Sequence, residues 1–97
     1  MKPSVRTPLP GPKAWALLER GERVLSPSYV RPYPFVPARG QGAFLEDVDG
    51  NLFLDFMSGI AVNTTGYAHP KVVEAVRAQA ERFAHVCFSD FTHEPTL

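Results

Sequence analysis

Three histidines are the first candidates for metal or acid–base chemistry in this 97-residue sequence. His69, His85 and His93 are separated by 16 and 8 positions along the chain. Neither interval matches the ligand spacing of a helical or finger-type metal site, and the single Cys87 provides no second thiolate. We therefore expect structural histidines with satisfied hydrogen bonds, and no metal site.

The hydroxyl and amine side chains do not form a recognisable catalytic set either. Ser58, Ser89 and Thr92 have no nucleophile elbow around them and no neighbouring base, so a hydrolase triad has no support. Lys71 follows a proline at the start of an expected helix, where nothing in the sequence desolvates its amine. By residue chemistry alone, the chain contains no complete catalytic set.

The acidic segment 47–51, Asp-Val-Asp-Gly-Asn, superficially suggests a calcium loop. Counted from Asp47, positions six and twelve hold Leu52 and Ser58, where an EF-hand needs glycine and glutamate. The pair Asp49-Gly50 is instead a strong signal for the turn of a β-hairpin. We expect both carboxylates to serve a solvated hairpin turn.

Composition and charge exclude several classes of protein. Ten lysines and arginines balance ten aspartates and glutamates, so no net field favours nucleic acid or an anionic membrane. The hydrophobic share of 44% is typical of a folded chain. There is no apolar run long enough to span a membrane, no secretory signal, and no second cysteine for a disulfide. We expect a soluble, cytoplasmic protein with no nucleic-acid or membrane partner.

The elements that must position any site begin with an arm over residues 1–40, where eight of the ten prolines lie. Within it, Gly11-Pro12 begins a predicted helix over residues 12–25. Residues 26–39 should be extended, because a residue that precedes proline is disfavoured in the α region. The aromatic side chains of this stretch need a partner surface to cover them.

A β-hairpin is predicted over residues 42–56, with strands at 43–48 and 51–56. A glycine-containing loop should follow over 57–69, and then a helix over 70–84 with an apolar stripe that must face a core. Residues 84–88 have the composition of a short strand, and residues 92–97 look like the start of another helix. We therefore expect the front end of a longer protein.

Five motifs, in this order, resemble those of one family. They are Asp47-Val48-Asp49-Gly50-Asn51, Phe53-Leu54-Asp55-Phe56, Ser58-Gly59-Ile60-Ala61-Val62, Gly66-Tyr67-Ala68-His69-Pro70-Lys71-Val72-Val73 and Ala78-Gln79. They resemble the N-terminal region of class III pyridoxal-phosphate-dependent aminotransferases. The segments 10–14 and 83–91 look most like the 4-aminobutyrate aminotransferase branch. Tyr67 is a departure, since the family usually has histidine there.

This resemblance implies an α+β chain that is the N-terminal part of a fold type I enzyme, built from a helix, an extended arm, a hairpin, a loop and a helix. It implies a homodimer that uses pyridoxal 5'-phosphate to move an amino group from an amino acid, such as 4-aminobutyrate, to a 2-oxo acid. In the family, the lysine that binds the cofactor lies further along the chain. We therefore assign no catalytic residue here and expect the 97-residue chain by itself to be inactive and to bind no cofactor.

The resemblance also carries site roles to matching positions. Ser58, Gly59 and Ile60 match the segment that lines the substrate pocket, with Ile60 as the apolar contact, although plain core packing of Ile60 is an equal alternative. Phe88 and Ser89 match a stretch near the cofactor and the entrance, contributed across the dimer. Two other functions stay open: an amino-acid racemase of the same cofactor class, and a stand-alone module whose proline-rich arm binds a partner.

Overall fold

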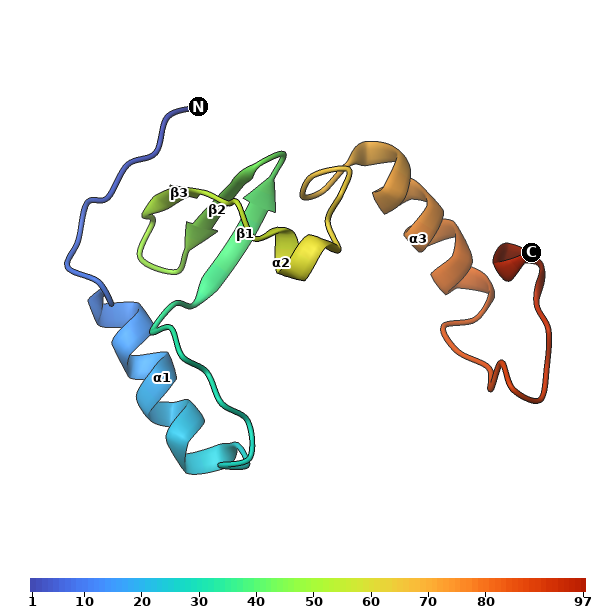
Figure 1. Ribbon diagram of the computed structural model, residues 1–97, viewed down its shortest axis with the longest axis horizontal. Coiled ribbons are helices and arrows are strands. Elements are labelled where there is room, and N and C mark those ends of the chain that lie inside the picture. Colours follow the sequence, from blue (N-terminus) through green and yellow to red (C-terminus); the bar gives the residue numbers. More distant parts are fainter.

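The computed structural model describes residues 1–97. In chain order its elements are helix α1 (Pro12–Val24), strands β1 (Pro37–Gln41), β2 (Phe44–Asp47) and β3 (Leu52–Leu54), the short α2 (Ser58–Ala61), helix α3 (Pro70–Arg82) and a 3₁₀ turn, η1 (Glu94–Thr96). Figure 1 shows a small sheet with α1 on one side, while α3 and the C-terminal segment extend away from it on the other.

Both long helices begin at a proline, as the sequence predicts. Pro12 opens α1 after Gly11, and Pro70 opens α3 after His69. Proline suits a first helical position because its missing N–H would have no partner there and its φ is already helical. The predicted helices over 12–25 and 70–84 are present, and they end one and two residues earlier than expected.

The hairpin is also present, but it belongs to a three-stranded antiparallel sheet with the order β1-β2-β3. β2 and β3 pair with Leu45 opposite Phe53. All of β1 but Gln41 lies within the predicted arm 1–40, and its pairing with β2 is irregular between Pro37 and Arg39. Proline is compatible with the start of an edge strand because no donor is needed on the open side, so the proline content concealed this strand.

The β2–β3 turn is held by a buried polar network, which corrects the expectation that its carboxylates are solvated. Asn51 is fully buried and Asp47 is 3% exposed. The Asn51 side-chain amide donates to Asp47 Oδ2 and to Thr7 Oγ1, both at 2.8 Å, and its carbonyl oxygen accepts from the N–H of Arg6 at 2.7 Å. A buried amide of this kind is stable only when its donors and acceptors are paired. The network therefore ties the N-terminal segment to the turn.

Asp49, at the tip of the same turn, caps helix α1. Its two carboxylate oxygens accept from the backbone N–H groups of Lys13 and Ala14, each at 2.9 Å. A carboxylate at a helix N-terminus satisfies orphan donors and favours the helix dipole. The contact is so close that a Cβ on Gly11 would overlap the Asp49 carboxylate, so position 11 requires glycine.

The extended arm after α1 touches the sheet region at its end, through the Phe35 ring and through the Val36 carbonyl, which accepts from the Val48 N–H at 3.0 Å. The Phe35 ring meets the Phe53 ring edge-to-face, with 5.3 Å between centroids. Tyr29 and Tyr33, further back in the arm, are mostly exposed. The arm thus reaches the sheet at one end only.

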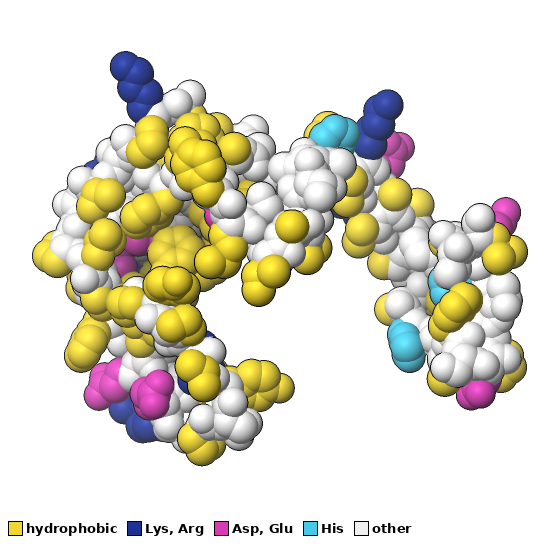
Figure 2. All heavy atoms as spheres, in the orientation of Figure 1, with side chains coloured by type: hydrophobic (Ala, Val, Ile, Leu, Met, Phe, Trp, Pro, Cys, Tyr) yellow, Lys and Arg dark blue, Asp and Glu magenta, His cyan; other side chains and the backbone are white.

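Very little of the chain is buried on itself. Four of the 97 residues are buried, and Ala14 is the only core hydrophobic side chain. The radius of gyration is 17.0 Å, whereas a compact domain of this length has about 12–13 Å. Figure 2 shows hydrophobic side chains on the open surface of both the sheet region and α3. The fold positions its elements without enclosing a core.

The C-terminal part differs from the sequence prediction. Residues 84–88 form no strand, and the predicted helix start over 92–97 is only the 3₁₀ turn η1. The Phe83 and Phe88 rings both pack edge-on against His93, at centroid distances of 5.7 and 5.8 Å. With no neighbouring strand to pair with, the β-branched and aromatic content of 84–88 does not produce a strand.

Candidate active-site wall

The segment predicted to line a substrate pocket forms one turn of left-handed helix. Ser58, Gly59, Ile60 and Ala61 have φ values of 52°, 62°, 64° and 60°. The turn is closed by backbone hydrogen bonds from Ala61 N–H to Met57 O at 3.0 Å and from Val62 N–H to Ser58 O at 2.9 Å. The sequence predicted a loop here.

This turn is strained. A left-handed conformation costs non-glycine residues roughly 1–2 kcal/mol each, and it is least expected of a β-branched side chain such as that of Ile60. Strain of this kind persists only where the surroundings hold it, and it clusters at ligand sites. The residues around the turn must therefore be considered part of the site.

Asp55 holds the entry to the turn. Its Oδ1 accepts from the Met57 N–H at 2.8 Å, and its Oδ2 accepts from the Ser58 N–H at 3.0 Å and from the Tyr67 hydroxyl at 2.6 Å. The bond to the N–H two residues on is the Asx-turn geometry that aspartate favours. One carboxylate thus joins three donors around the start of α2.

Tyr67 holds that carboxylate from the other side, and it is itself fixed to the sheet. Its backbone exchanges two hydrogen bonds with Gly42, at 2.8 and 3.0 Å. Its side chain lies so close to Gly40 that a Cβ there would come within 2.6 Å of the Tyr67 Cγ. Asp55 is in turn fixed by a bond from its N–H to the Ala43 carbonyl at 2.8 Å.

The contact shifts both ionisations. The Tyr67 hydroxyl and then the Met57 N–H stabilise the carboxylate, so the pKa of Asp55 lies below its ordinary value of 3.8. The same hydrogen bond to Asp55 raises the pKa of Tyr67 above 10.0, because the phenol must give up that bond to ionise. At neutral pH the pair is therefore a neutral phenol donating to a carboxylate.

The predicted wall residues are held by their backbone and leave their side chains free. Ile60 is 83% exposed, so the core-packing alternative for this side chain does not hold within residues 1–97. Gly59 is exposed and Ser58 is half-buried. An aliphatic side chain fixed on a strained turn and left uncovered is suited to contact another surface or a ligand.

The second predicted group is not brought to the first. Phe88 and Ser89 lie in an exposed turn in which the Asp90 N–H donates to the Cys87 carbonyl at 3.0 Å. Figure 1 shows this segment beyond the far end of α3, whereas α2 lies at the near end, next to the sheet. Within one chain, the two groups do not share a pocket.

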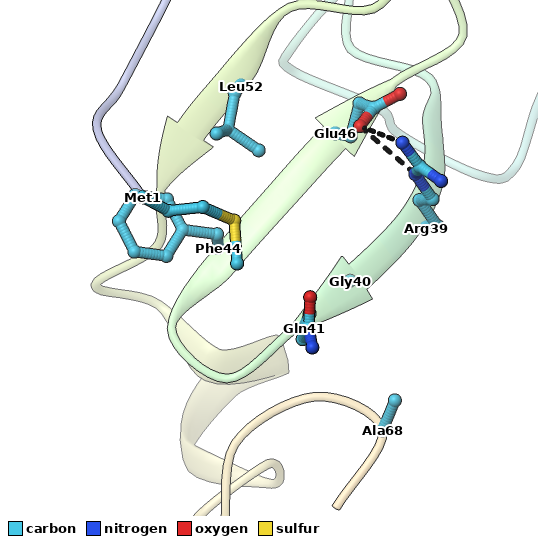
Figure 3. Close-up of a pocket in the computed structure, with 8 residues that line it drawn as sticks. All are labelled: Met1, Arg39, Gly40, Gln41, Phe44, Glu46, Leu52 and Ala68. Atoms are coloured by element: carbon cyan, nitrogen blue, oxygen red, sulfur yellow. Dashed lines mark hydrogen bonds and ion pairs between the residues drawn. The ribbon is translucent and has the colours of Figure 1, made fainter.

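Two hollows on the molecule involve other residues. One, of about 320 Å³, lies on the sheet beside Met1 and Phe44 and contains the Arg39–Glu46 ion pair at 2.7 Å (Figure 3). Because its charges are paired across the two strands, it offers no free charge to a ligand. The other, of about 690 Å³, runs along α3 and is lined by Val72, Val76 and Phe83.

His69, at the start of α3, departs from the prediction for the histidines. We expected satisfied structural histidines, but the buried Nδ1 of His69 has no hydrogen-bond partner. The residue also lines the hollow along α3. His93, in contrast, bonds to the Thr96 hydroxyl at 3.1 Å.

Residues 1–97 do not by themselves fit pyridoxal phosphate. The amines Lys2, Lys13 and Lys71 are all exposed, so none has the desolvated setting of a Schiff-base lysine. Phe88 and Ser89 are exposed as well, and no basic side chain accompanies them in their turn. We derive no chemical step through the cofactor from these residues.

Comparison with known proteins identifies the class. The pattern of the family described as "Aminotransferase class-III" matches residues 25–97, so the chain belongs to the class III aminotransferases, a pyridoxal-phosphate-dependent family. The resemblance seen in the sequence is thereby confirmed. The chain is 49% identical over 92 residues to an alanine/serine racemase of Pyrococcus horikoshii, covering 94% of this chain and 19% of that protein.

Two further relatives give the same result. The chain is 45% identical over 82 residues to a 4-aminobutyrate aminotransferase of Mycobacterium bovis, covering 84% of this chain and 18% of that protein. The crystal structure of acetylornithine aminotransferase from Elizabethkingia anophelis superposes with a TM-score of 0.71 at 33% identity, over 84% of this chain and 21% of that one. The chain thus spans about a fifth of its relatives' length, and its helix and small antiparallel sheet form the N-terminal part of fold type I. None of its helices is long and apolar enough to cross a membrane.

Asp55 and Tyr67 are the site residues that sequence reasoning missed. The available signal was Tyr67 itself, which stands where the resemblance leads one to expect histidine, together with an aspartate two residues before the start of the glycine-containing loop. An Asx-turn at Asp55 could have been predicted from residue type. The tyrosine on the other side of that carboxylate could not, because it is twelve residues away.

Proposed function

We propose that the protein containing residues 1–97 is a pyridoxal-phosphate-dependent aminotransferase that moves an amino group from an ω-amino acid such as 4-aminobutyrate to a 2-oxo acid. The family match over residues 25–97 carries the proposal. The 45% identity to the Mycobacterium bovis 4-aminobutyrate aminotransferase supports the choice of donor. Since this chain covers about a fifth of such relatives, the activity is that of the whole protein.

Within that enzyme, we assign residues 58–60 to the wall of the substrate site. Ile60 supplies an apolar contact that excludes water from the amino donor, and the left-handed turn holds the Ile60 side chain in a fixed position. The segment with Phe88 and Ser89 lies beyond the far end of α3 from α2, so we assign these two residues to the cofactor region of the partner subunit in a homodimer.

The activity is tested with the whole protein loaded with pyridoxal phosphate. With 4-aminobutyrate and 2-oxoglutarate, we expect glutamate to form in step with loss of the donor. Ile60→Ala should raise the KM for the donor on the order of tenfold, since methylene-sized contacts in such sites change kcat/KM by 10–200-fold. Val62→Ala, just beyond the turn and 75% exposed, is the matched control and should leave the KM unchanged. Equal KM values for the Ile60→Ala and parent enzymes would remove Ile60 from the site.

A second function, amino-acid racemisation, is favoured by the 49% identity to the Pyrococcus horikoshii alanine/serine racemase. The two activities separate when the whole protein is incubated with a single L- or D-amino acid and no oxo acid. Loss of optical rotation without formation of an oxo acid establishes the racemase and refutes transamination as the main activity. Unchanged rotation, with turnover only when an oxo acid is added, supports the aminotransferase.

A further inference from the structure

The turn that carries Ile60 is connected to the sheet by a short chain of contacts. We propose that Asp55 and Tyr67 are positioning residues that hold the turn Ser58–Ala61 in its left-handed form and thereby set where Ile60 meets the substrate. The inference rests on the proposed role of Ile60 in the substrate wall. In this role both residues act through the turn.

The first step runs from the turn to Asp55. Two consecutive backbone N–H groups, of Met57 and Ser58, donate to the two oxygens of this carboxylate at 2.8 and 3.0 Å. One donor belongs to the residue before the left-handed turn and the other to its first residue, Ser58, so their direction fixes the start of the turn. Without these two acceptor oxygens, the turn is free to relax toward right-handed conformations. The three non-glycine residues of the turn, Ser58, Ile60 and Ala61, prefer such conformations.

The second step runs from Asp55 to the sheet. The Asp55 side chain rotates about two torsions, and the Tyr67 hydroxyl adds a third restraint on it by donating to Oδ2 at 2.6 Å. Tyr67 cannot follow the turn if it moves, because its backbone is paired with Gly42 and its ring is pressed on Gly40 of β1. Tyr67 therefore adds a side-chain link between the turn and the edge strand β1, beside the backbone bond from the Asp55 N–H to the Ala43 carbonyl.

The test uses Tyr67→Phe in the whole protein, with Tyr33→Phe as control. The substitution removes only the hydroxyl, and Tyr33 is an exposed tyrosine of the arm whose hydroxyl makes no hydrogen bond. Hydrogen exchange of the amides of residues 57–63 should become faster in Tyr67→Phe by on the order of tenfold, since a hydrogen bond to a charged acceptor is lost. The control should exchange like the parent. Unchanged exchange in Tyr67→Phe overturns the proposal.

Kinetics test whether the restraint acts through Ile60. In Tyr67→Phe we expect the KM for the amino donor to rise several-fold while kcat stays within about twofold, because binding is affected and the chemical step is not. In an Ile60→Ala background, the same Tyr67→Phe change should leave the KM unaltered. A full, additive effect in that background means that Tyr67 acts elsewhere, and it refutes the proposal.

A second variant protects the test against simple misfolding. Asp55→Asn keeps the size of the side chain and one acceptor for Met57, but it presents an amide N–H where the Ser58 N–H and the Tyr67 hydroxyl need an acceptor. It should reproduce the faster exchange of residues 57–63 with a normal circular-dichroism spectrum, and normal exchange refutes the proposal. If the parent protein shows no amino transfer, the proposed function fails, but the exchange measurements still decide whether the pair holds the turn.

Discussion

Asp49 shows how one side chain links two distant parts of this chain, since both of its oxygens cap α1 from the hairpin turn. Replacing it with alanine should lower the free energy of unfolding of the whole protein by about 0.5–2 kcal/mol, the usual cost of losing an N-terminal cap. Urea unfolding measures the change. The control Asp90→Ala removes an exposed carboxylate that makes no side-chain hydrogen bond, and it should stay within about 0.5 kcal/mol of the parent. Equal losses in the two variants would contradict the capping role.

The pKa shifts of Asp55 and Tyr67 predict the pH range over which their hydrogen bond stabilises the turn. Since the pKa of Asp55 is lowered, its contribution is present above 3.8 and is lost as the pH falls through the depressed value. Since the pKa of Tyr67 is raised, its contribution is complete below 10.0 and is lost as the pH rises through the higher value. NMR of ¹³Cζ-labelled tyrosine should show one resonance that titrates at a higher pH than the others. This resonance should be absent in Tyr67→Phe. A set of tyrosines that all titrate together would refute this.

The chemistry of single residues could be predicted only where it is local. The residue pair Asp49-Gly50 predicts a hairpin turn, and the structure has this turn between β2 and β3. The buried Asp47 accepts from Asn51, whose own side-chain carbonyl accepts from the Arg6 N–H 45 residues away. Asp49 accepts from the Lys13 N–H 36 residues away, and no local pattern identifies either distant donor. For the same reason the expectation that both carboxylates are solvated was wrong for Asp47, which is buried.

Among the secondary-structure elements, the edge strand β1 and the loop before α3 meet at Gly40. Gly40→Ala should destabilise the whole protein by about 1–3 kcal/mol, because the new Cβ overlaps the Tyr67 ring, which is fixed in place. Gly21→Ala is the matched control: its Cβ meets only Leu25 at 3.6 Å, and alanine within α1 should instead stabilise by about 0.5–1 kcal/mol. Thermal unfolding midpoints should move in opposite directions. A shift in the same direction for both would show that the Gly40–Tyr67 contact is dispensable.

Elements with a periodic pattern or a strong turn signal were predicted well, and those fixed by tertiary contact were not. Proline at the first position and an apolar stripe suffice to locate α3. The strand β1 was missed because its sequence, Pro-Ala-Arg-Gly-Gln, has no strand-like pattern and forms by pairing with β2. The left-handed turn α2 could not be predicted because three of its four residues disfavour that conformation, and contacts at Asp55 impose it.

For the molecule as a whole, the open shape leaves the apolar face of α3 uncovered. Val72 and Val76 are 47% and 63% exposed, and with Phe83 they line the hollow along the helix. The isolated 97-residue chain should therefore self-associate, because it exposes a continuous apolar patch. Sedimentation velocity over a range of concentrations measures this. Val76→Gln should reduce the association and Arg77→Gln, also on α3, should not. A compact monomer at high concentration would contradict the prediction.

How much of the function could be predicted also depends on the share of the relatives' length that this chain spans, which is about a fifth. Residue chemistry alone stopped at a chain without a catalytic set, and the resemblance supplied the family that the family match then confirmed. The geometry adds what neither gave, namely that the predicted wall residues 58–60 lie on a strained and externally held turn. It also separates them from Phe88 and Ser89, a relation that depends on the length and direction of α3.

The cap that Asp49 provides also has a consequence for the order of events during synthesis on the ribosome. Residues 12–24 emerge first, but the carboxylate that satisfies their leading amides is translated about 36 positions later. At roughly 5–20 residues per second, the nascent segment waits about 2–7 s before its stabilising partner exists. Isolated helices of this length are marginal in water, so the segment should remain largely unstructured in the exit vestibule and become helical only once the β2–β3 turn has closed.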